Sequence, residues 1–228
     1  MATVIAILTR SPSDPRLKMR IESAVPNPGQ RRDLVLAFID DLSAKVALVE
    51  HATLKIAVTA PVEGFRLARP WVPWHQLVTQ RGATFGERLR HVVDDLVAAG
   101  HQHIVLLGAD VPDLPVSYLS DAVEFLDKDP NVVVTGPSAD GSFHLLGLTV
   151  SDGQVPDLFS TPKWGTASML DDLEAAARQA GRTVVRTGEW QDIDTPDDLA
   201  DLVDRLRDAP NTAPATADVL RTIGRIAR

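Results

Sequence analysis

Six apolar runs rich in valine and isoleucine are spread along the chain, with helical patterns between them. The runs are residues 3–9, 54–59, 104–108, 132–135, 143–149 and 183–187. Most are continuous rather than alternating, which is typical of strands covered on both faces of a sheet. The clearest helical pattern has the i, i+3, i+4, i+7, i+8 spacing and consists of Leu89, Val92, Val93, Leu96 and Val97. Strands that alternate with helices predict an α/β fold, with a mostly parallel central sheet and helices on both faces.

Length and composition favour one large domain over two small ones. The chain has 228 residues, of which 44% are hydrophobic, enough for a sizeable core without cross-links. It contains no cysteine, so disulfides and thiolate metal sites are excluded. We expect a single domain over residues 1–208. Residues 209–228 are expected to form a linker rich in proline, alanine and threonine, followed by a short helix over residues 219–226.

The charge balance narrows the classes of partner. A formal net charge of −8 argues against a nucleic acid, because phosphate binding requires a basic face. No stretch approaches the about 20 apolar residues that a membrane span needs. The apolar start at residues 1–10 has neither a preceding basic region nor a cleavage site, so it is predicted to be the first strand. We therefore expect a cytoplasmic protein with no nucleic-acid or membrane partner.

Acidic residues lie at three places where strands begin or end. Asp110 follows the 104–108 run closely, and further acids lie in the loops at residues 136–143 and 190–199. In an open parallel sheet, ligands bind at the carboxyl ends of the strands, so Asp110 is expected to face that crevice. One or two carboxylates together with substrate phosphates are a typical site for a hard divalent cation. Asp113 is instead expected to cap the helix that follows.

Six short motifs occur in order along nearly the whole chain. They are TRSPSDPRLKMR (residues 9–20), GATFGERL (82–89), GADVPDL (108–114), GPSADGSF (136–143), WGTASML (164–170) and DIDTPDDL (192–199). Together they resemble the motifs of the nucleotide-diphospho-sugar transferase superfamily. More closely, the chain looks like a bacterial family of small glycosyltransferase-like proteins, some of which are named for arsenosugar biosynthesis. The resemblance implies a single Rossmann-like, three-layer GT-A domain.

The resemblance also implies a metal site and an acceptor side. Asp110 matches the acid that holds the divalent cation, Mg²⁺ or Mn²⁺, in GT-A enzymes. Asp194 matches the second ligand, and its neighbour Asp192 could take that place. Asp140 matches an acceptor-side position, so the expected catalytic residues are Asp110, Asp194 and Asp140. Two alternatives stay open: Asp194 as a plain residue before a helix cap, and Asp140 as a turn former.

Two segments match positions that bind the nucleotide in this family. They supply Thr9, Arg10, Lys18 and Arg20 from the first loop, and Gly86, Glu87 and Arg88 from the start of a helix. Arginine binds phosphate as a planar fork and lysine as a point charge. The alternatives are a solvated basic loop for Lys18 and Arg20, and helix capping alone for the Gly86-Glu87-Arg88 segment. Trp164 matches a wall of the acceptor pocket, with a core tryptophan as the alternative.

The implied activity is metal-dependent transfer of a glycosyl group from a nucleotide sugar to a small-molecule acceptor. The first alternative is a guanylyltransferase-like nucleotidyltransferase that uses a nucleoside triphosphate and a phosphorylated small molecule. The first loop departs from the family pattern, because Asp14-Pro15 stands near the usual glycine and proline lacks the N–H that phosphate loops use. This departure keeps a second alternative open, a catalytically inactive nucleotide-binding scaffold. The WVPW segment at residues 71–74 is expected to be either a homodimer surface or a pocket wall.

Overall fold

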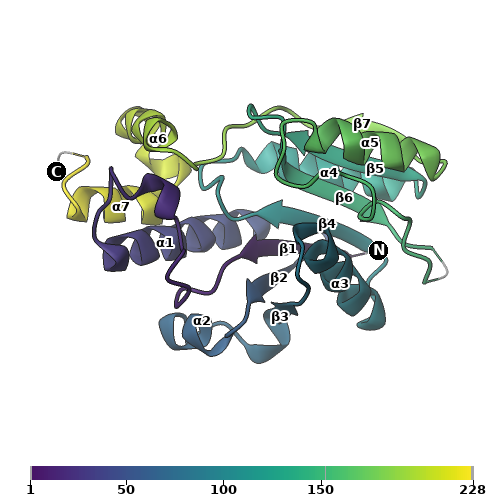
Figure 1. Cartoon of the computed structure of the whole chain (residues 1–228), viewed down its shortest axis with the longest axis horizontal. Coiled ribbons are helices and arrows are strands. Elements are labelled where there is room, and N and C mark those ends of the chain that lie inside the picture. The colour runs from purple at the N-terminus through teal and green to yellow at the C-terminus, as the bar shows by residue number, and fades with distance from the viewer. Residues whose placement is uncertain (1, 152, 227–228) are drawn as a thin grey trace.

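A seven-stranded sheet runs through the molecule, with helices on both faces (Figure 1). The computed structural model describes residues 2–151 and 153–226. The strand order is β3-β2-β1-β4-β6-β5-β7; β6 runs antiparallel to β4 and β5, and the other neighbours are parallel. The strands are β1 (Thr3–Thr9), β2 (Ala52–Thr59), β3 (Leu77–Gln80), β4 (His103–Gly108), β5 (Val132–Pro137), β6 (Phe143–Thr149) and β7 (Thr183–Arg186). The predicted α/β class and mostly parallel sheet are confirmed.

The helical spacing of residues 89–97 falls within α3 (Phe85–Ala98), as predicted. The α-helices are α1 (Pro28–Val46), α2 (Glu63–Ala68), α3 (Phe85–Ala98), α4 (Val116–Lys128), α5 (Met169–Gln179), α6 (Pro196–Asp208) and α7 (Pro214–Thr222), with 3-10 helices η1 (Met19–Ile21), η2 (Trp74–Gln76) and η3 (Pro210–Thr212). The start of α6 is capped by Thr195, whose Oγ1 accepts a hydrogen bond from the Asp198 amide at 3.2 Å. Within the described residues, no helix is both long and apolar enough to cross a bilayer.

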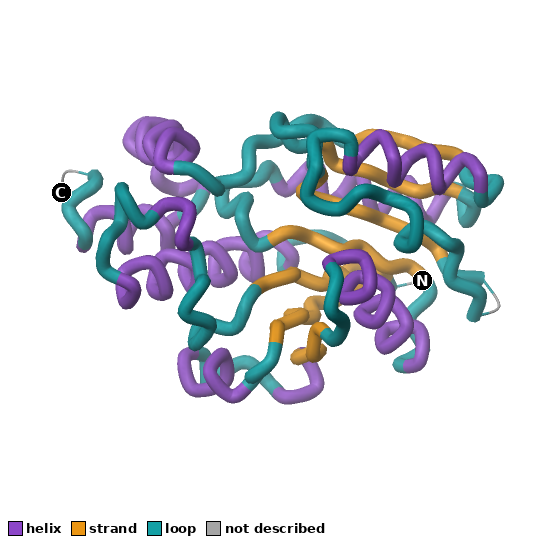
Figure 2. The backbone as a smooth tube through the Cα atoms, viewed as in Figure 1, coloured by secondary structure: helices purple, strands orange, loops and turns teal. Residues whose placement is uncertain are grey.

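Alternate residues of the central strands serve two different cores. Ile5 and Ile7 of β1 belong to a cluster with α1 and α4, whereas Val4 and Ala6 belong to a cluster with α3 and α5. Figure 2 shows the strands running between these helical layers. Burial on both faces explains why the strand sequences are apolar without alternation.

α1 is buried on two sides. Its residues Leu34 and Phe38 face a third apolar cluster, which α6 and α7 complete. Figure 1 shows α6 and α7 beside α1 at the end of the molecule that holds the C-terminal segment. The outer pair of helices therefore holds α1 against the sheet, and the loop that leads into α1 is held from the same side.

The C-terminal segment becomes helical earlier than predicted. Residues 209–218 were expected to be a linker, but they form η3 and the first half of α7, and the helix ends at Thr222. Asp41 of α1 explains the early start, because its carboxylate accepts hydrogen bonds from the amides of Ala215 at 2.9 Å and Thr216 at 2.8 Å. These are amides of the first turn of α7, which have no partner within the helix itself.

Two other local features differ from what the sequence indicates. The region 61–80 has no clear hydrophobic periodicity, but it contains α2, η2 and the edge strand β3. The prediction that Asp113 caps α4 was wrong, because Pro115 holds the N-cap position. The Asp113 carboxylate instead accepts hydrogen bonds from Arg205 Nε at 2.6 Å and from Trp190 Nε1 at 3.1 Å. It therefore ties the β4–α4 loop to α6 and to the loop that follows β7.

Candidate active site

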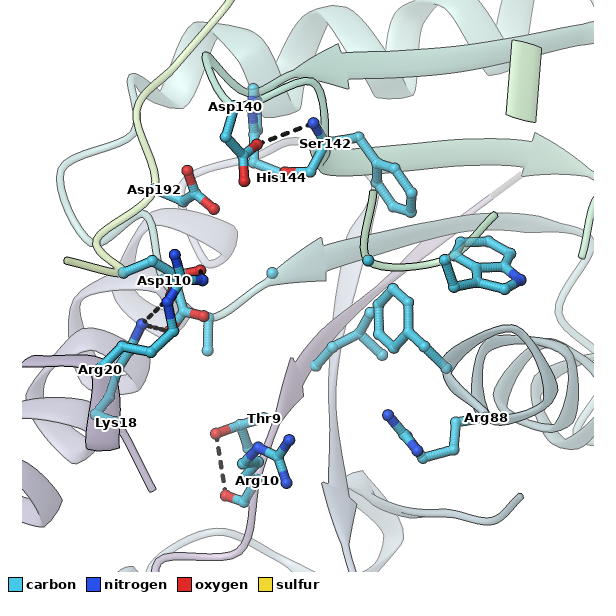
Figure 3. A pocket seen from close by; sticks show the side chains of 18 of the residues that line it. Thr9, Arg10, Lys18, Arg20, Arg88, Asp110, Asp140, Ser142, His144 and Asp192 are labelled. Carbon is cyan, nitrogen blue, oxygen red and sulfur yellow. Dashed lines mark hydrogen bonds and ion pairs between the residues drawn. The ribbon is translucent and has the colours of Figure 1, made fainter. Parts of the chain in front are cut away.

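A cleft of about 1170 Å³ opens at the carboxyl ends of β1, β2, β3 and β4. Its floor is made by the ends of these strands, and its walls come from the first loop, the start of α3, the β5–β6 turn and the loop before α6. Among the predicted site residues, the cleft is lined by Thr9, Arg10, Lys18, Arg20, Arg88, Asp110, Asp140, Asp192 and Asp194. Figure 3 shows the acidic side chains of Asp110, Asp140 and Asp192 on one side and Arg10 and Arg88 on the other.

Asp110 is held at the end of β4 by backbone hydrogen bonds on both sides. The amide of Ala109 donates to Leu8 O of β1 at 3.1 Å, and Asp110 O accepts from the amide of Ile193 at 2.8 Å. The second bond brings the loop of residues 192–194 next to Asp110, although the two segments lie more than 80 residues apart. The Asp110 side chain is 40% exposed, so its carboxylate stays open to the cleft.

Asp192 and Asp194 enter the cleft because Ile193 does not. Ile193 is fully buried in the cluster that α1, α6 and α7 share. Successive side chains of an extended segment point to opposite sides, so burial of the central residue directs both neighbours into the cleft. An isoleucine between two aspartates thus acts as the anchor that sets the position of both carboxylates.

Lys18 joins the two acids that the sequence predicts as metal ligands. Its Nζ lies 2.8 Å from Asp110 Oδ1 and 2.9 Å from Asp194 Oδ1, and it also donates to Ile193 O. Burial works against the charged ammonium, but the charges of Asp110 and Asp194 outweigh it and raise the pKa of Lys18. Burial raises the pKa of Asp110; Lys18 opposes this rise and Asp194 adds to it. The predicted basic loop is therefore not simply solvated.

The two remaining predicted acids, Asp192 and Asp140, also line the cleft. Burial raises the pKa of Asp192 to about 7, and the neighbouring charges of Asp194 and Asp140 contribute to the rise. Asp140 is exposed, and its Oδ1 accepts a hydrogen bond from the Ser142 amide at 2.9 Å. Asp140 thus forms the predicted turn and also lines the cleft.

The opposite side of the cleft carries three arginines, one of which sequence reasoning missed. Arg10 and Arg16 share a single carboxylate, Asp14, each at 3.2 Å. Arg88 makes no ion pair within the described residues, and its Nε is buried without a partner there. Burial lowers the pKa of Arg88, and the charges of Arg10 and Arg16 lower it further. Two guanidinium groups that share one carboxylate, and a third with no ion pair among the described residues, leave this side of the cleft able to bind an anion.

Aromatic rings form the end of the cleft near α3. Trp164 packs edge-on against Phe85 at a centroid distance of 5.4 Å and against Phe143 at 6.5 Å. Its Nε1 donates to Phe159 O at 3.1 Å, and the ring also lines the cleft. Trp164 is therefore a packed residue and a pocket wall at once, so both interpretations of it describe part of its environment.

Gly86 and Glu87 lie outside the cleft. A Cβ on Gly86 would lie 2.3 Å from Trp164 Nε1, so glycine is needed here for close packing. Glu87 accepts a hydrogen bond from the Thr84 amide at 3.1 Å, while Thr84 Oγ1 accepts one from the Glu87 amide at 3.2 Å. This reciprocal capping is the structural alternative that the sequence left open for this segment.

The WVPW segment does not reach the cleft either. Trp71 and Trp74 are 59% and 56% exposed, and neither lines the cleft. The guanidinium of Arg66 lies 4.5 Å from the ring centroid of Trp74. Of the two interpretations of this segment, a pocket wall has no support from the geometry, and the homodimer surface stays a prediction.

Two cleft residues could not be identified from their sequence context. His144 is buried in β6, and Gln80 ends the edge strand β3. Gln80 Nε2 donates to Thr9 O at 2.9 Å and to Ala57 O at 2.7 Å, which holds the end of β1 where the first loop begins. Neither residue stands in a recognisable motif, whereas Arg16 could have been found from its place in the first basic loop.

The altered first loop is compact despite its proline. Asp14 N donates to Ser11 O at 2.9 Å, and Leu17 N donates to Asp14 O at 3.0 Å. The Asp14 carboxylate also accepts a hydrogen bond from the Arg16 amide at 2.9 Å. Asp14 therefore organises the turn that presents Arg10 and Arg16, and the guanidinium groups provide the cationic contacts on this wall.

The residues at Asp110 fit a divalent cation. One oxygen of Asp110 and one of Asp194 face a common point, which the Lys18 ammonium occupies. Mg²⁺ typically takes one or two protein carboxylates and completes its coordination with water and substrate phosphates. The described residues hold no group of three or more acidic or histidine side chains placed to bind a metal. A cation here would therefore take the rest of its ligands from substrate phosphates and water.

Comparison with known proteins places the chain in a family. The sequence profile described as "Uncharacterized protein conserved in bacteria (DUF2064)" matches residues 42–166, more than half of the chain. The chain therefore belongs to this bacterial family, which confirms the resemblance seen in the motifs. No curated protein matches the chain.

Solved structures share the fold along nearly the full length. A candidate nucleotide-diphospho-sugar transferase from Desulfovibrio desulfuricans G20 is 27% identical, with a TM-score of 0.84 over 97% of this chain and 94% of that chain. CMP:2-keto-3-deoxy-manno-octonic acid synthetase, solved with CTP, is 13% identical, with a TM-score of 0.59 over 89% of this chain and 97% of that one. The inositol-1-phosphate CTP transferase from T. maritima is 14% identical, with a TM-score of 0.55 over 100% and 99%. The last two show the fold alone, and together these structures confirm the nucleotide-diphospho-sugar transferase fold.

Proposed function

We propose that the protein is a metal-dependent transferase that moves a glycosyl group from a nucleotide sugar to a small acceptor. One observation carries the proposal: a single cleft brings together Asp110, Asp194 and Lys18 on one side and three arginines on the other. This is the charge pattern that a diphosphate with a bound cation requires. The likeness to the D. desulfuricans protein supports the same class of donor.

Different residues of the cleft would bind the donor, the metal ion and the diphosphate. Arg10, Arg16 and Arg88 would bind the anionic donor, and Asp110 and Asp194 would hold Mg²⁺ or Mn²⁺. A bound cation would neutralise the charge that develops on the leaving diphosphate. Lys18 and Arg20 would bind oxygens of the same diphosphate through their positive charges.

The transfer step needs a proton acceptor as well as a leaving group. The acceptor hydroxyl forms a bond to the anomeric carbon while the bond from that carbon to the diphosphate breaks, and the nucleoside diphosphate leaves with the electron pair. The hydroxyl proton would pass to a carboxylate on the acidic side, where Asp140 and Asp192 lie. Asp192, with a pKa of about 7, suits a proton acceptor at neutral pH.

The cationic residues also favour a second candidate, nucleotidyl transfer. Lys18, Arg20 and the three arginines are five basic side chains in one cleft, so a cationic group is available for each phosphate of a triphosphate. In that reaction a phosphate oxygen of the acceptor attacks the α-phosphate, and pyrophosphate leaves. The enzymes with CTP in their names share the fold of this chain at low identity, so the argument for this reaction rests on the charge count.

Product analysis distinguishes the two reactions. The protein is incubated with Mn²⁺, panels of nucleotide sugars and nucleoside triphosphates, and pools of small-molecule acceptors that carry hydroxyl or phosphate groups. The released phosphates are then identified by chromatography. Nucleoside diphosphate release shows glycosyl transfer, and pyrophosphate release shows nucleotidyl transfer. Asp110→Asn should abolish either product, whereas Asp121→Asn, on the exposed face of α4, should not. Metal-dependent nucleotide binding without any product would overturn both and identify the protein as an inactive scaffold.

A further inference from the structure

The ammonium of Lys18 fully uses its hydrogen-bonding capacity inside the protein. A lysine ammonium has three donors, and here the acceptors are Asp110 Oδ1, Asp194 Oδ1 and Ile193 O. The Lys18 side chain is only 8% exposed, so water does not compete for these bonds. Lys18 is thus held as the counter-ion of two carboxylates that would otherwise repel each other.

Resting on the proposed function, we propose that Lys18 is an internal counter-ion that occupies the divalent-cation position, so that metal binds only when substrate phosphates take the ammonium away. Binding would then be ordered, with the nucleotide and its metal entering together. Lys18 is a positioning residue in this step, because it acts on the cation through Asp110 and Asp194.

Distances show why the ammonium and the cation exclude each other. A divalent cation of the Mg²⁺ type binds carboxylate oxygens at about 2.0–2.1 Å. The two oxygens that it would need are those within 2.9 Å of Lys18 Nζ. A cation bound to both oxygens would lie in the same gap, and two positive charges in one gap repel strongly.

The backbone at Lys18 supports a specialised role for this side chain. Lys18 has φ 48° and ψ 38°, the left-handed conformation that residues with a Cβ rarely adopt. Lys18 O accepts a hydrogen bond from the Ile21 amide at 3.2 Å, which holds the turn. Figure 3 shows the side chain extending from this turn to Asp110. Such a conformation carries a cost that the packing of η1 and the ion pairs must offset.

Arg20 provides a matched comparison within the same site. It lies 3.0 Å from Asp194 Oδ2, but it makes no ion pair with Asp110 in the described structure, and its side chain is 67% exposed. Removal of Arg20 therefore takes one positive charge from the site and leaves the shared gap filled. If total charge alone controlled the metal affinity, Lys18 and Arg20 would be equivalent.

The test measures Mn²⁺ binding in the absence of any nucleotide. Mn²⁺ is titrated into wild type, Lys18→Met and Arg20→Met, and the free ion is followed by electron paramagnetic resonance. We expect Lys18→Met to bind Mn²⁺ at least about tenfold more tightly than wild type, because the competing charge is gone. Arg20→Met should change the affinity less than about threefold, since its charge is exposed and screened. Equal affinities of Lys18→Met and wild type, or equal gains in both variants, would overturn the proposal.

A second variant and a second readout keep the test valid if Lys18→Met is unstable. Lys18→Gln removes the charge but keeps a polar side chain, and it should show the same gain in affinity. Both variants should melt at a lower temperature than wild type in the presence of a chelator and recover with Mn²⁺ more than wild type does. A variant that Mn²⁺ does not stabilise more than wild type would contradict the proposal. Neither measurement depends on transfer activity. A wild-type protein without activity would therefore refute the proposed function but not the counter-ion role of Lys18.

Discussion

His144 is an ionisable residue placed where a charge has no support. It is 2% exposed, its Nδ1 lies 3.0 Å from Pro137 O, and its Nε2 is buried without a partner in the described structure. The ring stacks on Tyr118 at a centroid distance of 6.5 Å. Burial lowers the pKa of His144 to about 4, although the Pro137 carbonyl opposes the shift. The imidazole is therefore neutral in the folded protein at neutral pH.

This burial predicts a loss of stability in mild acid. Below about pH 6.5 the unfolded chain protonates this histidine, while the folded protein does not until about pH 4. The unfolded state then binds more protons, so the free energy of unfolding falls as the pH falls through this window. The full loss is about 3 kcal/mol for a shift of this size. Urea unfolding of wild type and His144→Gln between pH 7.5 and about pH 4 measures it.

The comparison between the two proteins isolates this histidine. His144→Gln is expected to be less stable at neutral pH, because it loses the stacking on Tyr118. Its deficit should shrink as the pH falls, since glutamine does not titrate. A deficit that stays constant over the whole range would show that His144 is not buried in its neutral form.

Asp192 should change the stability with pH in the opposite direction to His144. Burial and the charges of Asp194 and Asp140 raise its pKa to about 7, far above that of an unfolded aspartate. Between about pH 4 and 7 the folded protein retains a proton that the unfolded chain has lost, so the group weakens folding as the pH rises. Asp192→Asn should therefore melt above wild type at pH 8 and converge with it near pH 4, measured with a chelator present. A melting difference independent of pH would contradict the raised pKa.

The sequence predicts the site acids better than their contacts. Asp110 and Asp194 could be named because strand ends and motif positions place them at one edge of the sheet. The ion pairs of Lys18 could not, because they depend on a left-handed turn at a residue that is not glycine. Asp113 shows the same limit: its position favours a cap, but the distant Arg205 provides a stronger partner.

At the scale of elements, α7 depends on one carboxylate from α1. Asp41 is 3% exposed and accepts hydrogen bonds from two amides of α7 and from Thr216 Oγ1 at 2.6 Å. Burial raises the pKa of Asp41, and the bonds from Thr216 and Ala215 oppose the rise. Asp41→Ala leaves these donors buried without a partner, so it should cost about 2–3 kcal/mol.

Urea unfolding of Asp41→Ala checks this contribution, with Asp33→Ala as the matched control. Asp33 lies on the same helix, and its side chain is 54% exposed. The control should change the free energy of unfolding by less than about 0.5 kcal/mol. If both variants lose the same stability, the carboxylate of Asp41 does not stabilise α7.

The elements that the sequence missed are those without a strong local signal. β3 has four residues, only one of them buried, and pairs with β2 alone at the edge of the sheet. The prolines and tryptophans that precede β3 in the sequence obscure any hydrophobic periodicity. The start of α7 was missed for a different reason, since Asp41 provides the cap from a helix that lies more than 170 residues away. Local sequence patterns do not predict contacts between segments that lie far apart in the chain.

At the scale of the whole molecule, the apolar clusters join all the layers into one cooperative unit. α1 contacts the sheet through one face and α6 and α7 through the other. The loop of residues 192–194, which carries two of the cleft acids, is anchored in that outer cluster through Ile193. The C-terminal segment should therefore stabilise the fold and also hold the acidic side of the cleft in place.

Removal of residues 209–228 tests this dependence. The truncated chain would expose Leu34 and Phe38 of α1 and lose the burial of Ala217 and Leu220. Such losses amount to about 5 kcal/mol or more, comparable with the whole stability of many domains. We expect the truncated protein to melt far below the full chain or not to fold, as measured by circular dichroism. Leu220→Ala, which removes one side chain of the same contact, should cost about 2–4 kcal/mol. If the truncated protein has the same melting temperature as the full chain, residues 1–208 fold independently and α7 adds no stability.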